Sequence, residues 1–208
     1  MKKAGRILVL LVLTTLLLTA SLAQAAGANP RAAPNTAAVQ AEKPKKVQLR
    51  VNTAFAYCAL EMTGSYDQHQ AAFEKLFIEA MKQGIFGGAP FGIYWNNPNI
   101  TPVEKLKWEV GFSVPAGQVV NEPLKLKTWN FRTTAVFDYS GEFEAEAMTK
   151  AYSEVFKWIV DHGYRLAGPV MERFLNIPSA NEKGVLIGHV ETIVPVEKAP
   201  VMKEKKAK

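Results

Sequence analysis

A carboxylate stands between two apolar side chains in the segment 168–174, Gly-Pro-Val-Met-Glu-Arg-Phe. The Gly-Pro pair is typical of a turn that leads into a strand. Alternation along that strand places Val170, Glu172 and Phe174 on one face. A carboxylate on an apolar face must find a partner, stay protonated or meet a cationic ligand. We therefore treat Glu172 as a candidate ligand-binding residue, with an ordinary ion pair or a solvated strand edge as the alternative.

The short motifs of metal, redox and dinucleotide sites are missing from the sequence, which has no CxxC, HExxH or GxGxxG. Its three histidines, His69, His162 and His189, lie far apart and lack the spacing of metal ligands. Cys58 is the only cysteine, which excludes an intrachain disulfide, and its apolar neighbours are typical of a buried thiol. We expect no cofactor and no bound metal.

The net charge of +6 is unevenly distributed along the chain. The basic excess lies near the two ends, and residues 47–197 carry a net charge of −4. A nucleic-acid-binding face needs clustered Lys and Arg, so we expect no nucleic-acid partner for this region. A mildly acidic body is compatible with a cationic ligand.

The first 25 residues have the three parts of a secretory signal peptide. Basic residues come first, an apolar run covers 7–18, and Ala23-Gln24-Ala25 is an A-x-A cleavage site. We predict cleavage after Ala25 and export to the periplasm. The alternative is an uncleaved signal sequence, which would be the only membrane attachment expected.

Two further segments are predicted to lack structure. Residues 26–46 are rich in Ala, Pro, Asn and Lys without an apolar period, which indicates a disordered linker. The Lys-rich residues 198–208 are interpreted as a basic disordered tail. Residues 47–197 remain as a folded domain of ordinary size.

The domain contains an internal repeat in which each half reads strand, helix, strand, strand. The first half predicts a strand over 51–60, a capping box from Ser65 to Gln68, a helix closed by Gly84, and strands over 91–95 and 108–114. The second half predicts a strand over 131–139, a turn at Ser140-Gly141, a helix closed by Gly163, and strands over 170–175 and 185–194, the last ending at Pro195. Apolar spacing predicts the core faces of the helices: Phe73, Leu76, Phe77, Ala80 and Met81 in the first, and Met148, Tyr152, Val155, Phe156 and Ile159 in the second.

Neither half can bury the face of its own sheet, so we expect the two halves to pack as one domain. The predicted fold class is α+β: duplicated β-α-β-β units related by a pseudo-twofold axis, with antiparallel sheets and both helices on one side. We expect a central groove where the halves meet, on the side away from the helices.

Aligning Pro98 with Pro178 places Gly92 at the position of Glu172 and Tyr94 at that of Phe174. One half then offers a carboxylate, and the other offers a gap and a phenol, as expected for a single off-centre ligand site. Aromatic residues that could line this site by stacking or cation–π contact are Tyr57, Trp95, Trp108 and Trp129, with ordinary core packing as the alternative for each.

The repeated order, the segment Gly-Pro-x-x-Glu-x-Phe and the closing Val-Pro resemble the GyrI-like small-molecule-binding domain, the effector-binding domain of AraC-type and MerR-type regulators. The resemblance covers residues 48–196 and implies two β-α-β-β units around a central apolar pocket. In drug-sensing members, a Glu at the pocket floor meets lipophilic cations, and that position matches Glu172. A signal peptide precedes the domain here in place of a DNA-binding helix-turn-helix, so we expect a stand-alone exported version.

The resemblance also implies two other activities. Some members hydrolyse strained small electrophiles with a Glu and a nearby Tyr or Trp. The family often has Tyr two residues after the Glu, where this chain has Phe174, and this departure weakens the inference. Haem-binding proteins of the SOUL type share the superfamily shape, and His162 and His189 would be the candidate ligands, without a spacing that supports them.

We expect binding of a small organic molecule rather than catalysis, with a lipophilic cation as the ligand class. The proposed ligand-binding residues are Glu172, Tyr94, Phe174, Trp95, Trp129 and Tyr57. One alternative is a hydrolase with Glu172 as general base and Tyr94 as hydrogen-bond donor, which a hydrogen bond between these two side chains would favour. The other alternative is a module that binds a protein partner, which a filled groove and an exposed apolar patch would favour.

Overall fold

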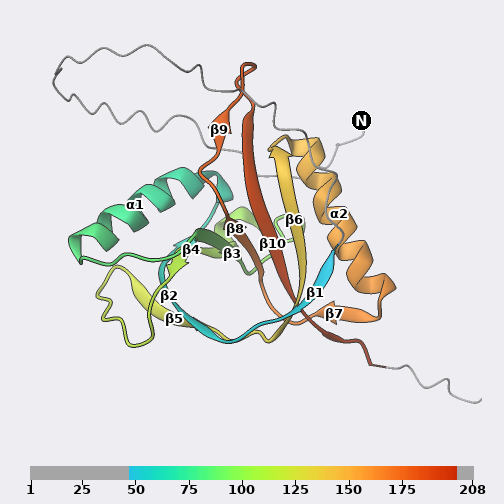
Figure 1. The fold of residues 1–208 in the computed structure, drawn as a ribbon, viewed down its shortest axis with the longest axis horizontal. Coiled ribbons are helices and arrows are strands. Elements are labelled where there is room, and N and C mark those ends of the chain that lie inside the picture. The colour runs from blue at the N-terminus through green and yellow to red at the C-terminus, as the bar shows by residue number, and fades with distance from the viewer. Residues whose placement is uncertain (1–46, 201–208) are drawn as a thin grey trace, which may run out of the picture.

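The computed structural model describes residues 47–200 (Figure 1). The predicted signal peptide, the predicted linker and residues 201–208 of the predicted tail lie outside the described residues. No helix within 47–200 is long and apolar enough to cross a membrane.

The described chain forms two α-helices, ten strands and two short 3₁₀ helices. The elements of the first half are β1 (Gln48–Val51), β2 (Phe55–Thr63), a 3₁₀ turn (Tyr66–Gln68), α1 (His69–Lys82), β3 (Pro90–Tyr94), a second 3₁₀ turn (Val103–Lys105) and β4 (Lys107–Ser113). Those of the second half are β5 (Lys125–Trp129), β6 (Thr133–Glu142), α2 (Ala145–Asp161), β7 (Tyr164–Leu166), β8 (Val170–Phe174), β9 (Ser179–Ala180) and β10 (Leu186–Lys198).

All strand pairs are antiparallel, and the strands follow the order β1-β6-β10-β8-β3-β4-β2-β5, with β7 and β9 also paired to β10. The predicted α+β class is confirmed. The order is symmetric about its centre, so that each strand of one half has a counterpart in the other: β3 corresponds to β8, β4 to β10, β2 to β6 and β1 to β5. The pseudo-twofold axis passes between β3 and β8, where Gly92 pairs directly with Glu172.

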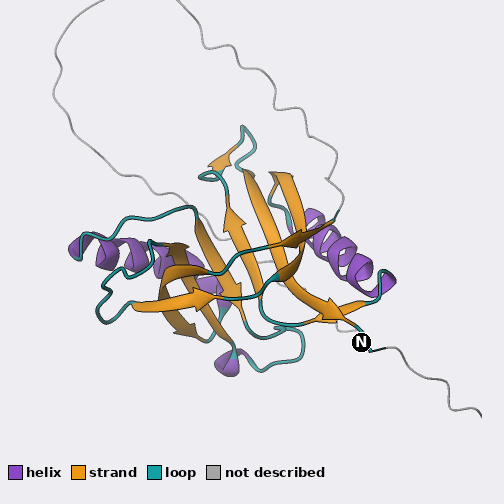
Figure 2. Ribbon diagram, turned by 60° about the horizontal axis from the view of Figure 1, so that its bottom comes forward, coloured by secondary structure: helices purple, strands orange, loops and turns teal. Residues whose placement is uncertain are grey.

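The two halves exchange their edge strands. β1 begins the first half but pairs with β6 of the second half, and β5 begins the second half but pairs with β2 of the first half. The strand pairs join into one continuous sheet, and its strands curve across the molecule (Figure 2). The halves are therefore interlocked by pairing at three places: the centre and both edges.

Both helices bury one face at the same spacing. The buried residues are His69, Ala72, Leu76 and Ala80 in α1, and Met148, Ala151, Val155 and Ile159 in α2. The prediction for α2 agrees with this face, whereas that for α1 was wrong at Phe77 and Met81, which are 42% and 70% exposed. Phe77 and Met81 each follow a residue of the buried stripe, Leu76 and Ala80, by one position, so their side chains turn toward solvent. Ser65 accepts a hydrogen bond from the Asp67 backbone N–H, which caps the 3₁₀ turn rather than α1 itself.

Some strand limits differ from the prediction. The segment expected as one strand over 51–60 is broken at residues 52–54, and Ser140-Gly141 continues β6 instead of turning. β10 runs through Pro195, which lies between the residues that pair with β8 and those that pair with β7. The short strands β5, β7 and β9 were not predicted, because their few apolar residues leave no clear alternation.

The helices cover the same face of the sheet, as predicted. α1 packs on β2 and β4, and α2 packs on β6 and β7, so the two helices stand at opposite ends of the layer (Figure 1). The other face is closed by a core drawn from both halves: Tyr57, Ala59, Phe91, Ile93, Trp129, Val136, Met171 and Ile193. This core fills the side on which the groove was predicted, and the prediction of that side was wrong.

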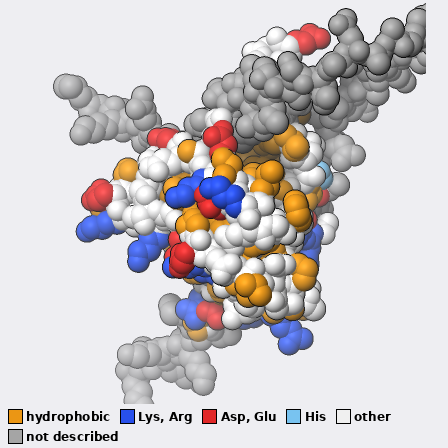
Figure 3. Space-filling model, turned by 90° about the vertical axis from the view of Figure 1, so that its left-hand side faces the viewer, with side chains coloured by type: hydrophobic (Ala, Val, Ile, Leu, Met, Phe, Trp, Pro, Cys, Tyr) orange, Lys and Arg blue, Asp and Glu red, His pale blue; other side chains and the backbone are white. Residues whose placement is uncertain are grey.

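Apolar side chains also lie on the outer surface of α1. Phe77, Ile78 and Met81 are exposed there. Viewed from the α1 side, hydrophobic side chains are interspersed with charged ones (Figure 3).

Candidate functional site

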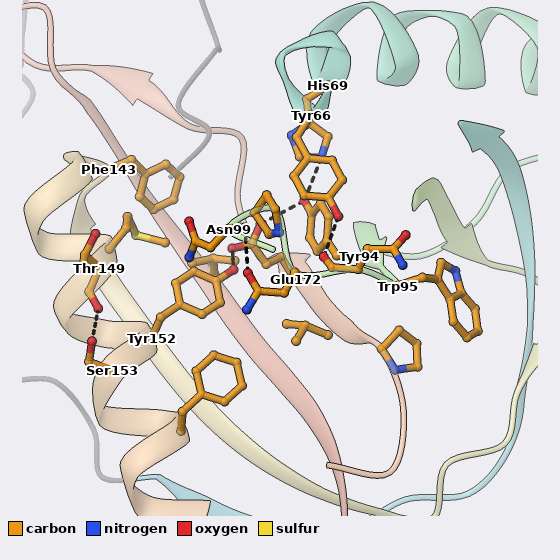
Figure 4. A pocket seen from close by; sticks show the side chains of 18 of the residues that line it. Tyr66, His69, Tyr94, Trp95, Asn99, Phe143, Thr149, Tyr152, Ser153 and Glu172 are labelled. Atoms are coloured by element: carbon orange, nitrogen blue, oxygen red, sulfur yellow. Dashed lines mark hydrogen bonds between the residues drawn. The ribbon is translucent and has the colours of Figure 1, made fainter. Parts of the chain in front are cut away.

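A pocket of about 740 Å³ lies between the two helices, above β3 and β8 (Figure 4). Aromatic and aliphatic side chains supply most of its wall, including Phe73 from α1 and Met148, Tyr152 and Phe156 from α2. The size is that of a typical small-molecule site. The pseudo-twofold arrangement thus leaves a cavity at its centre, on the helix face of the sheet.

Glu172 lies at the floor of the pocket, at the centre of β8. Its Oε2 accepts a hydrogen bond of 3.1 Å from the Tyr94 hydroxyl, and its Oε1 accepts one from the Tyr152 hydroxyl. Among the described residues that line the pocket, Glu172 is the only Asp, Glu, Lys or Arg. The carboxylate is thus held by two neutral phenols.

Burial raises the pKa of the Glu172 carboxyl above its ordinary value, and the hydrogen bonds from Tyr152 and Tyr94 act in the opposite direction. The pKa values of both phenols are raised well above the ordinary range, first by burial and then by the adjacent Glu172 charge. Both tyrosines therefore stay neutral donors at physiological pH.

Two other carboxylates of the described chain, 1% exposed Glu109 on β4 and 5% exposed Glu191 on β10, show how burial is usually compensated. Glu109 pairs with Lys127 and accepts a 2.7 Å hydrogen bond from Tyr57. Glu191 pairs with Arg50 and Arg173, which together hold its pKa below the ordinary value against the effect of burial. Glu172, which is half-buried, has no such cation among residues 47–200.

The glycine opposite Glu172 makes room for the Tyr94 phenol. A Cβ on Gly92 would lie 2.5 Å from the Tyr94 oxygen and 2.9 Å from the carbon that bears it. Any larger residue at position 92 would displace this ring from its place above β3. The gap predicted at Gly92 and the phenol predicted at Tyr94 thus belong together, because the missing side chain makes room for the ring.

The Tyr94 oxygen has a second neighbour, the buried His69 at the start of α1. Its Nε2 lies 2.7 Å from the Tyr94 oxygen, and the ring also packs edge-to-face against Trp108, with 4.7 Å between ring centroids. Burial lowers the pKa of His69 to about 4, against the charge of Asp67. His69 is therefore neutral at physiological pH.

The structure brings four of the six predicted ligand-binding residues to the pocket: Glu172, Tyr94, Phe174 and Trp95. Phe174 meets Phe73 of α1 edge-to-face, with 5.8 Å between ring centroids, and Trp95 is 50% exposed. Tyr57 and Trp129 do not line the pocket, because strand alternation turns them into the core on the opposite sheet face. Trp108 is buried against α1 and His69.

Sequence reasoning missed Tyr152 and His69 as site residues. Tyr152 was assigned to the core face of α2, but a phenol on such a face needs a polar partner, and this requirement was a usable signal. His69 carried no signal, because its partner Tyr94 is distant in sequence and only folding brings them together.

The histidines proposed as haem ligands have other partners. His162 stacks on Trp158 at the end of α2, and its Nδ1 lies 2.8 Å from the Trp158 carbonyl oxygen. His189 pairs with Asp138. Neither histidine lines the pocket. Within residues 47–200, no group of three His, Cys, Asp or Glu side chains could hold a metal ion.

The polar groups of the site come from non-equivalent positions of the two halves. Glu172 lies at the position of Gly92, and Tyr94 at that of Phe174, as predicted from the alignment. Because the buried residues of α1 and α2 have the same spacing, the two helices can be aligned, and His69 then corresponds to Met148 and Phe73 to Tyr152. Each half supplies an apolar residue where the other supplies a polar one, so a pseudo-symmetric fold holds one asymmetric site.

Comparison with known proteins identifies the domain. The family model of the GyrI-like small molecule binding domain matches residues 37–197. No match to the sequence is found among curated proteins.

Several solved structures share the fold. The C-terminal domain of EcmrR is 15% identical with a TM-score of 0.60, over 74% of this chain and 98% of that domain. A hydrolase from Listeria innocua is 14% identical with a TM-score of 0.55, over 75% of this chain and 94% of the other. An uncharacterized conserved protein from Listeria innocua is 13% identical with a TM-score of 0.57, over 73% and 92% of the two chains.

The duplicated units, the central pocket and the family match over most of the sequence lead to one assignment: the chain belongs to the family of GyrI-like small molecule binding domains.

Proposed function

We propose that this protein binds a small lipophilic cation, with Glu172 supplying the opposite charge. One observation carries the proposal: among the described residues, the only charged side chain lining the pocket is a carboxylate whose partners are phenols, whereas Glu109 and Glu191 each have a Lys or Arg partner. A ligand cation would complete the pairing that the protein leaves open.

The surroundings favour such a ligand over a metal ion or a polar solute. Opposite charges attract more strongly away from bulk water, so a cation near Glu172 would gain more than at the surface. The aromatic rings of Tyr94, Tyr152 and Phe174 offer faces for cation–π contact. Binding would also lower the raised pKa of Glu172, because a nearby cation favours the ionised carboxylate.

The test compares a cation with a neutral molecule of the same shape. Benzyltrimethylammonium and its carbon isostere neopentylbenzene differ in charge and hardly at all in size. Glu172→Gln is expected to weaken binding of the cation by about 1–3 kcal/mol, the order of a charge–charge attraction in a partly desolvated site, and to leave the isostere nearly unchanged. Tryptophan fluorescence can follow both titrations, because Trp95 lines the pocket.

A matched control is Glu154→Gln, which removes an exposed carboxylate of α2 that does not line the pocket. It should leave both affinities as in the native protein. Equal losses for the cation and the isostere in Glu172→Gln would contradict the proposed role of Glu172.

A second candidate function is hydrolysis of a small electrophile, and the 3.1 Å Tyr94–Glu172 hydrogen bond is the observation that favours it. Glu172 would act as general base toward water, with a phenol as hydrogen-bond donor. Incubation with styrene oxide, followed by mass spectrometry of the diol, tests this role. If the native protein forms the diol and Glu172→Gln does not, the result supports the hydrolase. If the native protein leaves the epoxide unchanged, the result supports binding without catalysis.

The third hypothesis, a module for a protein partner, called for a filled groove. The face opposite the helices is filled, and α1 exposes Phe77, Ile78 and Met81, as this hypothesis requires. The helix face nevertheless contains an open pocket of about 740 Å³, so we favour the small-molecule function. Export of the domain to the periplasm belongs to the same proposal and is supported by the residue pattern of positions 1–25.

A further inference from the structure

The Tyr94 hydroxyl lies between two polar atoms but carries a single proton. Its oxygen is 2.7 Å from His69 Nε2 and 3.1 Å from Glu172 Oε2. A phenol can donate one hydrogen bond and accept others. The direction of both contacts therefore depends on which ring nitrogen of His69 carries its hydrogen.

Only one arrangement satisfies all three groups when Glu172 is ionised. An ionised carboxylate can only accept, so the Tyr94 proton must point to Glu172. The Tyr94 oxygen then needs a donor at Nε2, which requires the neutral His69 with its hydrogen on that nitrogen. With the hydrogen on Nδ1, Tyr94 would face two acceptors with one proton, and one contact would be lost.

Packing holds the imidazole in the orientation that this donation needs. His69 is 7% exposed. Its ring lies edge-to-face against Trp108 and Tyr94 and stacks near Tyr66 and Phe73. On the other side of the carboxylate, the described residues provide the Tyr152 hydroxyl with no partner beyond Glu172. The two phenols thus differ, since one has a donor behind it and the other does not.

We propose that His69 is a positioning residue, which donates its Nε2 hydrogen to the Tyr94 oxygen and so commits the only Tyr94 proton to Glu172. Donation into the Tyr94 oxygen polarises its O–H bond, which strengthens the next hydrogen bond in the chain. His69 thereby keeps the Tyr94 side of the carboxylate occupied and leaves the Tyr152 side as the one that a ligand can rearrange. The inference concerns the Glu172 site and holds for any ligand class.

The first measurement is the tautomer of His69, read from ring ¹⁵N chemical shifts of the unliganded native protein. We expect a protonated Nε2 and an unprotonated Nδ1. A hydrogen on Nδ1 with Nε2 bare would overturn the proposal. This measurement requires no variant, so it remains decisive even if substitutions at position 69 prevent folding.

The second measurement is the Glu172 pKa, read by ¹³C NMR of the carboxyl carbon, with the resonance assigned by its loss in Glu172→Gln. His69→Met introduces the residue of the equivalent position 148 and removes the donor, while His69→Gln keeps an N–H near Nε2. The groups that face Glu172 are Tyr94 and Tyr152, and Asp67 is the charged group that acts on His69.

Loss of the donor should raise the Glu172 pKa by about half a unit, because the hydrogen bond that favours the ionised form weakens, and His69→Gln should restore it. An unchanged pKa in a folded His69→Met variant, or equal shifts in both variants, would overturn the proposal. Neither readout involves a ligand, so a failure of the cation preference in the fluorescence titrations would be distinguishable from a failure here.

Discussion

Glu172 is a carboxylate whose burial is only partly compensated within the protein. Two phenols satisfy its oxygens, yet its pKa remains raised because burial outweighs their effect. Glu191, with two arginines, shows the opposite direction. Glu191 belongs to an internal ion pair, whereas a cation for Glu172 would have to come from the proposed ligand.

The raised pKa predicts how the stability of the protein depends on pH. The folded state binds the Glu172 proton more tightly than the unfolded state, so this residue favours folding most below the ordinary Glu pKa. That contribution is lost as the pH rises through the raised folded pKa. Each unit of pKa elevation corresponds to about 1.4 kcal/mol.

Glu172→Gln removes this dependence and leaves every other titrating group in place. We therefore expect equal free energies of unfolding for the two proteins near pH 4 and a growing advantage of the Gln variant toward pH 7. Urea unfolding across this range provides the measurement. A Gln variant that is less stable at pH 7 would mean that the ionised carboxylate stabilises the fold.

The exchanged edge strands β1 and β5 do more than extend the sheet. Each brings a cation to a buried carboxylate: Arg50 of β1 reaches Glu191, and Lys127 of β5 reaches Glu109. The register makes these two pairs equivalent under the pseudo-twofold axis. Strand exchange and charge pairing therefore act together at both ends of the sheet.

The two cations should differ in importance. Lys127→Met leaves Glu109 with only the Tyr57 hydroxyl and should destabilise the protein by about 3–5 kcal/mol, as expected when one partner of a buried pair is removed. Arg50→Met should cost less, because Arg173 still pairs with Glu191 and the Arg50 side chain is 40% exposed. Urea unfolding of both variants measures the difference.

The double variant Glu109→Gln/Lys127→Met is the control for this prediction. It removes the unpaired charge together with its former partner, so much of the lost stability should return. If the double variant were as unstable as Lys127→Met, lost packing of the lysine stem would be the better explanation.

Across the whole molecule, the two halves cannot separate without breaking strand pairs at the centre and at both edges. The connection between β4 and β5 includes the exposed Gly117. A protease site inserted after Gly117 should therefore be cut without release of either half. The two fragments should elute together in size-exclusion chromatography under native conditions and separate only in denaturant. Separation in native buffer would show two independent domains.

The location of the whole protein is a separate prediction. If residues 1–25 act as a signal peptide, protein expressed from the full sequence in a bacterium should reach the periplasm and begin at Ala26. N-terminal sequencing of the periplasmic fraction measures this. Full-length protein that retains Met1 in the membrane fraction would contradict cleavage.

The sequence by itself determined the α+β class, the duplicated units and the strand face that Glu172 shares with Val170 and Phe174. These features follow from local rules: alternation, helical spacing, and Gly and Pro at the ends of elements. The equivalence of Gly92 with Glu172 could also be derived, because the repeat preserves its spacing and the pseudo-twofold axis turns that spacing into strand register.

Only the tertiary structure decided which side of the sheet holds the pocket, which aromatic residues reach it and what satisfies the carboxylate. Tyr57 and Trp129 lie in the opposite core, whereas Tyr152 and His69 complete the site. The physical reason is that these outcomes depend on contacts between elements distant in the chain. The curvature of the sheet and the separation of the two helices set those contacts, and no local pattern of residues encodes them.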